Sequence, residues 1–181
     1  MIDISECLQI AKSAALLAGE FLAKTETSDL KILFNKGRDI KLQLDIDTEN
    51  IIKEYIQSHS DYSILGEETG SSDTLDDFYW VIDPLDGTSN FLRGIPISCV
   101  SIALMHKLEP ILGVIYDFNH NEIYFGHKES KAFLNNNEIH VSLLSLKHES
   151  TLVTGIPAKT NYSDDEFNQL ISTFQSWKKI R

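Results

Sequence analysis

The sequence predicts a layered α+β domain in which N-terminal helices pack on a mostly antiparallel sheet. Apolar residues recur at helical spacing as far as residue 56. Short apolar runs with polar connections, which are typical of strands, follow between residues 63 and 133. No internal repeat, low-complexity tract or linker rich in proline and glycine is visible. We therefore expect residues 1–181 to form a single domain around one core.

Two amphipathic helices are expected first. One covers residues 4–23, and Asp3 is placed to cap its start. A polar stretch follows, and the second helix is expected over residues 48–56 because its isoleucines fall on one face. Asp45 and Asp47 would then lie at or just before the first residue of this second helix.

The predicted strands begin with two short buried runs, residues 63–66 and 78–82. Each run ends in a carboxylate, at Glu67 and Asp83 respectively. Three further β-rich runs cover residues 99–104, 111–116 and 122–125. Their short connections suit an antiparallel meander, which we expect to be the main sheet.

The C-terminal part is expected to contain a short strand over residues 151–154 and a helix over residues 163–177. The apolar residues that this helix would turn inward are Phe167, Leu170, Ile171 and Phe174.

The charge balance argues against nucleic acid as a partner. The chain has 16 Lys and Arg against 27 Asp and Glu, a net charge of −11, whereas a protein that binds a nucleic acid must neutralise phosphates. An acidic protein can still handle a small phosphate ester when divalent cations stand between its carboxylates and the phosphate.

The two cysteines, Cys7 and Cys99, form no CxxC pair, which fits a reducing compartment. The N-terminus is acidic, and no apolar run approaches the ~18 residues that a membrane span needs. We therefore expect a cytoplasmic protein that does not enter a membrane.

The most informative segment is WVIDPLDGTSNF, residues 80–91. Pro84 fixes its own φ and Gly87 permits a backbone conformation that other residues resist, so Asp83 and Asp86 can be held close across a tight turn. Two hard oxygen ligands would then converge on one cation. An Asp-Pro-x-Asp-Gly turn that binds nothing is the alternative.

If Thr88 begins a short helix, the free amides of Gly87 and Thr88 form a seat for a phosphate group. The Thr88 hydroxyl could orient a metal-bound water that lies between it and a second carboxylate. Glu67 is the best candidate for that carboxylate.

Residues 80–91 resemble, without a gap, the signature of the inositol monophosphatase superfamily. A second element of that family, Gly-Glu-Glu, corresponds to residues 66–68. A third is matched more loosely by residues 36–45, where Leu42 and Gln43 replace the usual Val-Thr and Asp45 corresponds to the last aspartate. A helix cap without a catalytic role remains the alternative for Asp45. The resemblance spans nearly the whole chain.

The resemblance implies a layered sugar-phosphatase-type fold and a site for two or three Mg²⁺ ions. Glu67, Asp83 and the backbone carbonyl of Leu85 would hold the first ion, and Asp83 with Asp86 the second. Glu67 would also touch a third, loosely held ion. Ligation by oxygen alone favours Mg²⁺ or Mn²⁺ over Zn²⁺.

The resemblance also assigns the remaining roles. Thr88 and Glu67, supported by Asp45, would activate the attacking water. The amides of Gly87 and Thr88 would hold the phosphate, with Asp86 beside the substrate.

The implied activity is lithium-sensitive hydrolysis of a small phosphomonoester. Ser89, Asn90 and Phe91 resemble the form found in inositol phosphatases, whereas the nucleotide-directed branch usually has Lys-Glu-Phe. This favours inositol monophosphate or a related sugar phosphate as the substrate. Fructose-1,6-bisphosphatase, histidinol-phosphatase and 3′(2′),5′-bisphosphate nucleotidase activities remain open. The resemblance further suggests a homodimer.

The sequence departs from the family pattern in one respect. Family members are longer, and their C-terminal half carries a Trp-Asp element whose aspartate completes the second metal site. The tryptophans here are Trp80 and Trp177, and Lys178 follows the second. We therefore expect a chain that lacks the C-terminal half of the fold. A non-catalytic module that binds metal and phosphate is the alternative to the enzyme.

Overall fold

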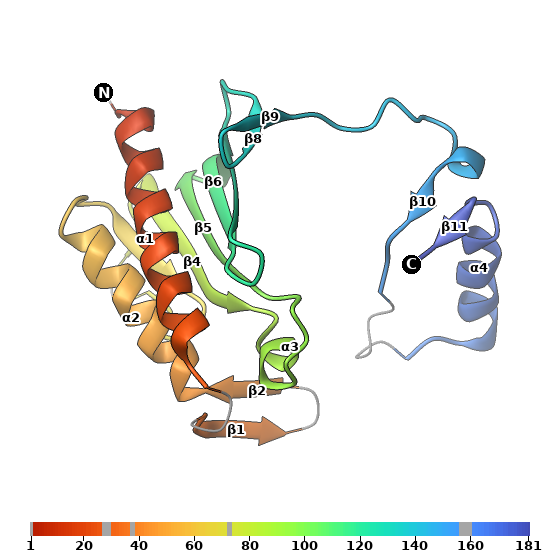
Figure 1. Cartoon of the computed structure of the whole chain (residues 1–181), viewed down its shortest axis with the longest axis horizontal. Helices are drawn as coiled ribbons and strands as arrows, with labels where there is room; N and C mark the ends of the chain where they lie inside the picture. Colours follow the sequence, from red (N-terminus) through yellow and green to blue (C-terminus); the bar gives the residue numbers. More distant parts are fainter. Residues whose placement is uncertain (1, 27–29, 37–38, 72–73, 156–160) are drawn as a thin grey trace. The chain divides into compact units, whose positions relative to one another are not determined.

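The computed structural model describes residues 2–26, 30–36, 39–71, 74–155 and 161–181. They form two compact units, Met1–Ile139 and His140–Arg181 (Figure 1). The expectation of a single domain over residues 1–181 stays a prediction. Within the described residues, no helix is long and apolar enough to cross a membrane.

Two helices cover one face of the sheet in the first unit (Figure 1). Helix α1, Ile4–Lys24, confirms the first predicted helix, and the Asp3 carboxylate accepts a hydrogen bond from the N–H of Glu6 at 3.0 Å. Helix α2, Gln43–Gln57, begins earlier than predicted. Asp45 and Asp47 therefore lie inside the helix and not before it. The reason is that the Asp45 Oδ2 reaches back to accept the N–H of Leu42 at 2.8 Å, which caps the helix from its own first turn.

The main sheet has seven strands in the described residues, in the order β3-β4-β5-β6-β7-β8-β9. Their bounds are Ser63–Gly66, Phe78–Asp86, Cys99–His106, Glu109–Asp117, Glu122–His127, Ala132–Leu134 and Asn137–Ile139. Strand β3 pairs with β4 in parallel, and every other neighbouring pair is antiparallel. The predicted meander and the mostly antiparallel sheet are confirmed.

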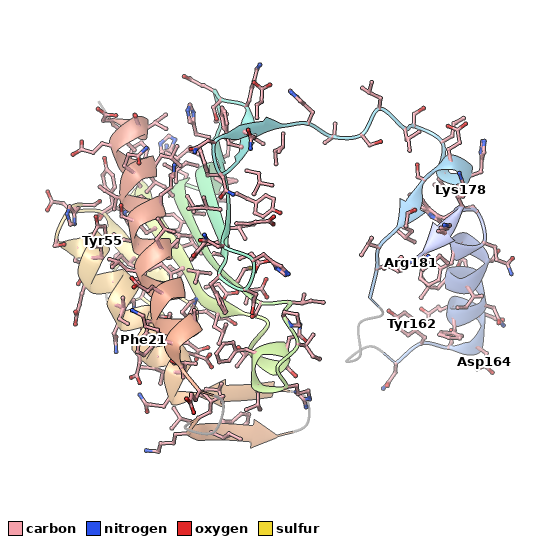
Figure 2. The ribbon with its side chains drawn as sticks, in the orientation of Figure 1. Phe21, Tyr55, Tyr162, Asp164, Lys178 and Arg181 are labelled. Carbon is pink, nitrogen blue, oxygen red and sulfur yellow. The ribbon has the colours of Figure 1, made fainter. Side chains whose placement is uncertain are left out.

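The core lies between the two helices and the sheet. Leu22 of α1, Ile52 of α2 and Trp80 of β4 are almost completely buried there. Phe21 and Tyr55, labelled on the two helices in Figure 2, pack against the core and are partly buried. Burying each large apolar side chain contributes roughly 1.5–3 kcal/mol, so this interface holds the first unit together.

A small hairpin between the two helices was not predicted. Strand β1, Ile32–Lys36, pairs antiparallel with β2, Asp39–Leu42. This region was predicted as a polar stretch, but it contains the apolar run Ile32-Leu33-Phe34, which favours a strand. Residues 37–38 lie outside the described residues.

The second unit contains α4, Asp164–Phe174, and a parallel pair formed by β10, Thr151–Leu152, and β11, Lys179–Ile180. A 3₁₀ turn, Lys147–Glu149, precedes β10. The N–H of Ser163 donates to the Glu166 carboxylate at 2.9 Å, which fixes the start of α4 near Asp164, labelled in Figure 2. No residue of α4 is fully buried, but Leu170 and Phe174 of the predicted inward face are partly buried.

Candidate active site

The centre of the site is a β-bulge in strand β4. Asp83 lies opposite Ser101 and Asp86 lies opposite Cys99, so one more residue is present on β4 than on β5. Pro84 sits inside this bulge, where its lack of an N–H removes no regular ladder hydrogen bond. The strand therefore continues to Asp86, and the tight turn expected after Asp83 is a bulge within the strand.

Gly87 follows the bulge in a left-handed conformation, with φ 88°. A Cβ at this position would lie 2.7 Å from the carbonyl oxygen of Ile97, which is closer than real Cβ contacts allow. Glycine is thus required both for the backbone angle and for the close approach of the neighbouring chain. The short helix α3, Thr88–Leu92, begins immediately afterwards, as predicted.

The Thr88 hydroxyl donates a hydrogen bond to the carbonyl oxygen of Leu85 at 3.0 Å. The side chain of Leu85 is buried, so the backbone that carries this carbonyl is fixed by packing. The structure therefore brings together the expected catalytic hydroxyl and the expected metal-binding carbonyl.

Parallel pairing of β3 with β4 brings Glu67 beside Asp83. The N–H of Glu67 donates to the carbonyl of Ile82 at 3.0 Å, and the carboxyl groups of Glu67 and Asp83 lie within hydrogen-bonding reach of each other. Burial, then the contact with Glu67 and the charge of Asp86, raise the pKa of Asp83 to about 7. A hydrogen bond from the N–H of Leu85 at 3.2 Å opposes this rise.

Asp86 is exposed and lies next to Cys99, whose Sγ is 3.9 Å from the Asp86 Oδ2. Burial and the charges of Asp86, Asp83 and Asp117 raise the pKa of Cys99 to about 11. The thiol is therefore neutral at ordinary pH and is a poor nucleophile.

Asp45 is 1% exposed and lies in the first turn of α2. Its hydrogen bond to the N–H of Leu42 is the contact of a helix cap, which is the alternative role weighed for it. Its part in activating water stays a prediction.

Comparisons with known proteins give the family to which the chain belongs. Residues 3–179 match the profile of the inositol monophosphatase family. The chain belongs to this family. It is 34% identical over 167 residues to an inositol monophosphatase of Mesembryanthemum crystallinum, with 90% of this chain covered. It is 35% identical over 167 residues to a protein of Aquifex aeolicus named fructose-1,6-bisphosphatase/inositol-1-monophosphatase, with 88% of this chain covered.

A solved inositol monophosphatase from Anabaena shares the fold with a TM-score of 0.81 and 32% identity, over 99% of this chain and 67% of that one. The layered α+β fold of the family is thus confirmed. The present chain covers 62% of each of the two curated relatives named above. The lack of the C-terminal half stays a prediction.

The donors available to a family metal are the carboxylates of Glu67, Asp83 and Asp86 and the carbonyl of Leu85. All are hard oxygen ligands, which suits Mg²⁺. Burial first, and then the neighbouring Glu67 and Asp86, raise the pKa of Asp83, and a divalent cation would favour its charged form. Among the described residues, however, no three side chains of His, Cys, Asp or Glu lie close enough to hold an ion. The donors therefore fit the ion in their chemistry but are not gathered into a ligand cluster.

A cavity of about 430 Å³ adjoins Asp86 and Gly87. Asp117, His120 and Tyr124 also line it. The Nδ1 of His120 lies 2.7 Å from the Asp117 Oδ2, and this contact raises the pKa of His120. The cavity places polar side chains beside the predicted phosphate seat.

One charged residue close to the site, Glu49, was not predicted from the sequence. Glu49 on α2 is 0% exposed, and its carboxylate accepts hydrogen bonds from the backbone that follows β3. The signal was present, because Glu49 shares the buried helix face with Ile52 and Ile56. A carboxylate on such a face needs partners inside the fold.

Proposed function

We propose that this chain hydrolyses a small phosphomonoester in an Mg²⁺-dependent reaction. The observation that carries the proposal is the backbone geometry that gathers these groups: the N–H of Glu67 is bound to Ile82, directly before Asp83, and the Thr88 hydroxyl is bound to the Leu85 carbonyl. This combination offers hard oxygen ligands and a proton-carrying hydroxyl at one end of a buried strand.

Glu67, Asp83 and the Leu85 carbonyl would hold one Mg²⁺, and Asp83 with Asp86 a second. When bound, such ions supply charge for the phosphoryl group, the attacking water and the leaving alkoxide. A third ion at Glu67 and replacement by Mn²⁺ belong to the same proposal.

The other residues of the site would position the attacking water and the phosphate and would transfer a proton. The Thr88 hydroxyl donates a hydrogen bond to the carbonyl oxygen of Leu85. In the working site it would instead bond to a water molecule that it shares with Glu67. The amides at Gly87 and Thr88 would bind the phosphate oxygens, since they lie at the start of α3. Asp45 would support this arrangement from α2.

Inositol monophosphate or a related sugar phosphate is the proposed substrate. The printed names of the relatives, an inositol monophosphatase and a fructose-1,6-bisphosphatase/inositol-1-monophosphatase, support this class. We place the reaction in the cytoplasm and expect a homodimer. A module that binds metal and phosphate without turnover is the second candidate, because among the described residues no three possible ligand side chains are gathered for an ion.

The test is phosphate release from inositol 1-phosphate, with and without Mg²⁺ and Li⁺, by the parent chain and by Asp83→Asn. We expect release that needs Mg²⁺, is inhibited by Li⁺ and falls at least about 100-fold in Asp83→Asn, because a shared ligand is lost. Asp77→Asn, an exposed carboxylate at the other end of the sheet, is the matched control. Mg²⁺ binding without release would favour the non-catalytic module, and neither binding nor release would reject both candidates.

A further inference from the structure

The loop that carries Glu67 is closed on itself. It starts at Gly66, the last residue of β3, and ends at Gly70. The N–H of Gly66 donates to the carbonyl of Gly70 at 3.2 Å, and the N–H of Gly70 donates to the carbonyl of Gly66 at 3.1 Å. Glu67 is exposed on this loop, so its side chain is available to a ligand.

The amides between these glycines are also held. The N–H of Glu67 is bound to the carbonyl of Ile82 on β4. The next two amides bind one side chain from α2: the N–H of Glu68 donates to the Glu49 Oε2 at 2.8 Å, and the N–H of Thr69 donates to the Glu49 Oε1 at 3.2 Å. A single carboxylate thus fills the concave side of the loop.

Glu49 is fixed in its turn. Lys53, one helical turn later, places its Nζ 2.9 Å from the Glu49 Oε1, and the Thr69 hydroxyl donates to the same oxygen. A Cβ on Gly66 would lie 2.2 Å from that oxygen, so the loop rests directly on the carboxylate. Burial favours the neutral acid, but the hydrogen bonds from Thr69, Lys53 and the Glu68 amide outweigh it and lower the pKa of Glu49.

Burial of a carboxylate is unfavourable by itself, because its desolvation costs several kcal/mol. An apolar side chain at position 49 would avoid that cost, but it would leave two backbone N–H groups without an acceptor. The arrangement is therefore explained by what Glu49 holds, which is the backbone that directly follows Glu67.

We propose that Glu49 is a positioning residue that fixes the Gly66–Gly70 loop so that the Glu67 carboxylate meets Asp83 at the metal site. The inference rests on the metal site of the proposed function, but not on turnover. Outer partners that orient metal ligands typically change affinity 10- to 100-fold when removed, which sets the size of the effect.

The experiment uses the whole chain and Mn²⁺ as the probe. Mn²⁺ affinity is measured by electron paramagnetic resonance or calorimetry, and protection of the loop amides by hydrogen exchange. We expect Glu49→Gln to weaken Mn²⁺ binding about 10-fold or more and to reduce protection at Glu68 and Thr69, because the amide offers one acceptor instead of two. The matched control is Glu54→Gln, which makes the same change on an exposed position of α2.

Two further variants distinguish a positioning role of Glu49 from misfolding and from a purely structural role. Thr69→Val removes the hydroxyl, which donates to Glu49 and accepts from Lys53, and should weaken Mn²⁺ binding about threefold. Glu49→Asp keeps the charge and should bind Mn²⁺ more tightly than Glu49→Gln. Unchanged Mn²⁺ affinity in Glu49→Gln and Thr69→Val, with lost amide protection, would overturn the proposal. So would a parent chain that does not bind Mn²⁺. A parent that binds Mn²⁺ but releases no phosphate would reject the proposed function alone.

Discussion

Two backbone corners meet at the candidate site, and they are built in different ways. The corner after β4 is made by its own residues: a bulge at Pro84, a left-handed Gly87 and a hydroxyl of Thr88 that bonds to Leu85. The corner after β3 is held from a distance, by the Glu49 carboxylate on α2.

The difference shows why the support of one corner is visible in the sequence and the support of the other is not. A locally built corner needs particular residues at consecutive positions, and these form a contiguous motif. The residues Gly66-Glu67-Glu68 of the other corner could be identified from the sequence, but nothing in them points to Glu49 as the side chain that holds them. The first should be sensitive to backbone changes, and the second to changes at its remote partner.

The largest effect is expected for Gly87→Ala. Gly87 and Gly94 both have positive φ, 88° and 66°, but a Cβ at Gly94 meets nothing within 4 Å. Gly94→Ala should therefore cost only the backbone strain, about 1 kcal/mol of unfolding free energy. Gly87→Ala adds a collision with the carbonyl of Ile97 and should cost about 3 kcal/mol. Urea unfolding measures both, and equal losses would show that the close approach is not limiting.

A smaller effect is expected for Gly66→Ala, and it should depend on Glu49. The Cβ would collide with a side chain here and not with backbone, so the collision disappears when Glu49 is shortened to alanine. A double-mutant cycle of Gly66→Ala and Glu49→Ala should show a coupling of about 1–2 kcal/mol. The cycle of Gly87→Ala with Glu49→Ala serves as control and should be additive. Additivity in both cycles would contradict support of the β3 corner by Glu49.

The same contrast explains how far the fold could be predicted. Helical periodicity located α1, and the alternation of apolar runs with polar connections located the meander. The start of α2 was predicted too late. In the sequence, Asp45 resembles a cap that precedes a helix, but in the structure it lies in the first turn of α2 and caps the helix from there. The hairpin β1–β2 was missed, since its short apolar run lies within a polar segment.

For the site, the residues of the contiguous motif could be named from the sequence, but their relations could not. Neither the bulge at Pro84 nor the contact of Asp86 with Cys99 has a local sequence signal, because both depend on pairing with β5. The parallel pairing of β3 with β4, which brings Glu67 next to Asp83, is likewise a long-range interaction without a local sequence signal. Glu49 is the clearest case of a long-range relation, because the amides that it binds, those of Glu68 and Thr69, follow β3 and do not belong to its own helix.

The smallest expected effect tests whether the two corners bring like charges together. The pKa of Asp83 is raised from 3.8 to about 7, first by burial and then by Glu67 and Asp86. The folded chain therefore binds this proton more tightly than the unfolded chain, so the contribution of Asp83 to stability falls as pH rises from about 4 to about 7. In metal-free buffer, Asp83→Asn should be more stable than the parent above pH 7, by about 1 kcal/mol after solvent screening, and equal to it near pH 4.

Urea unfolding across this pH range with a chelator present makes the measurement, and Glu67→Gln is the companion variant. Removing the Glu67 charge should flatten the parent's pH dependence, since burial and Asp86 alone would then raise the pKa of Asp83. Adding Mg²⁺ should reverse the order of stability above pH 7, because the cation stabilises only the chain that keeps both carboxylates. A pH dependence that is unchanged in Glu67→Gln would mean that the carboxyls of the two corners do not meet in solution, and the metal site would then have to be assembled by the ion itself.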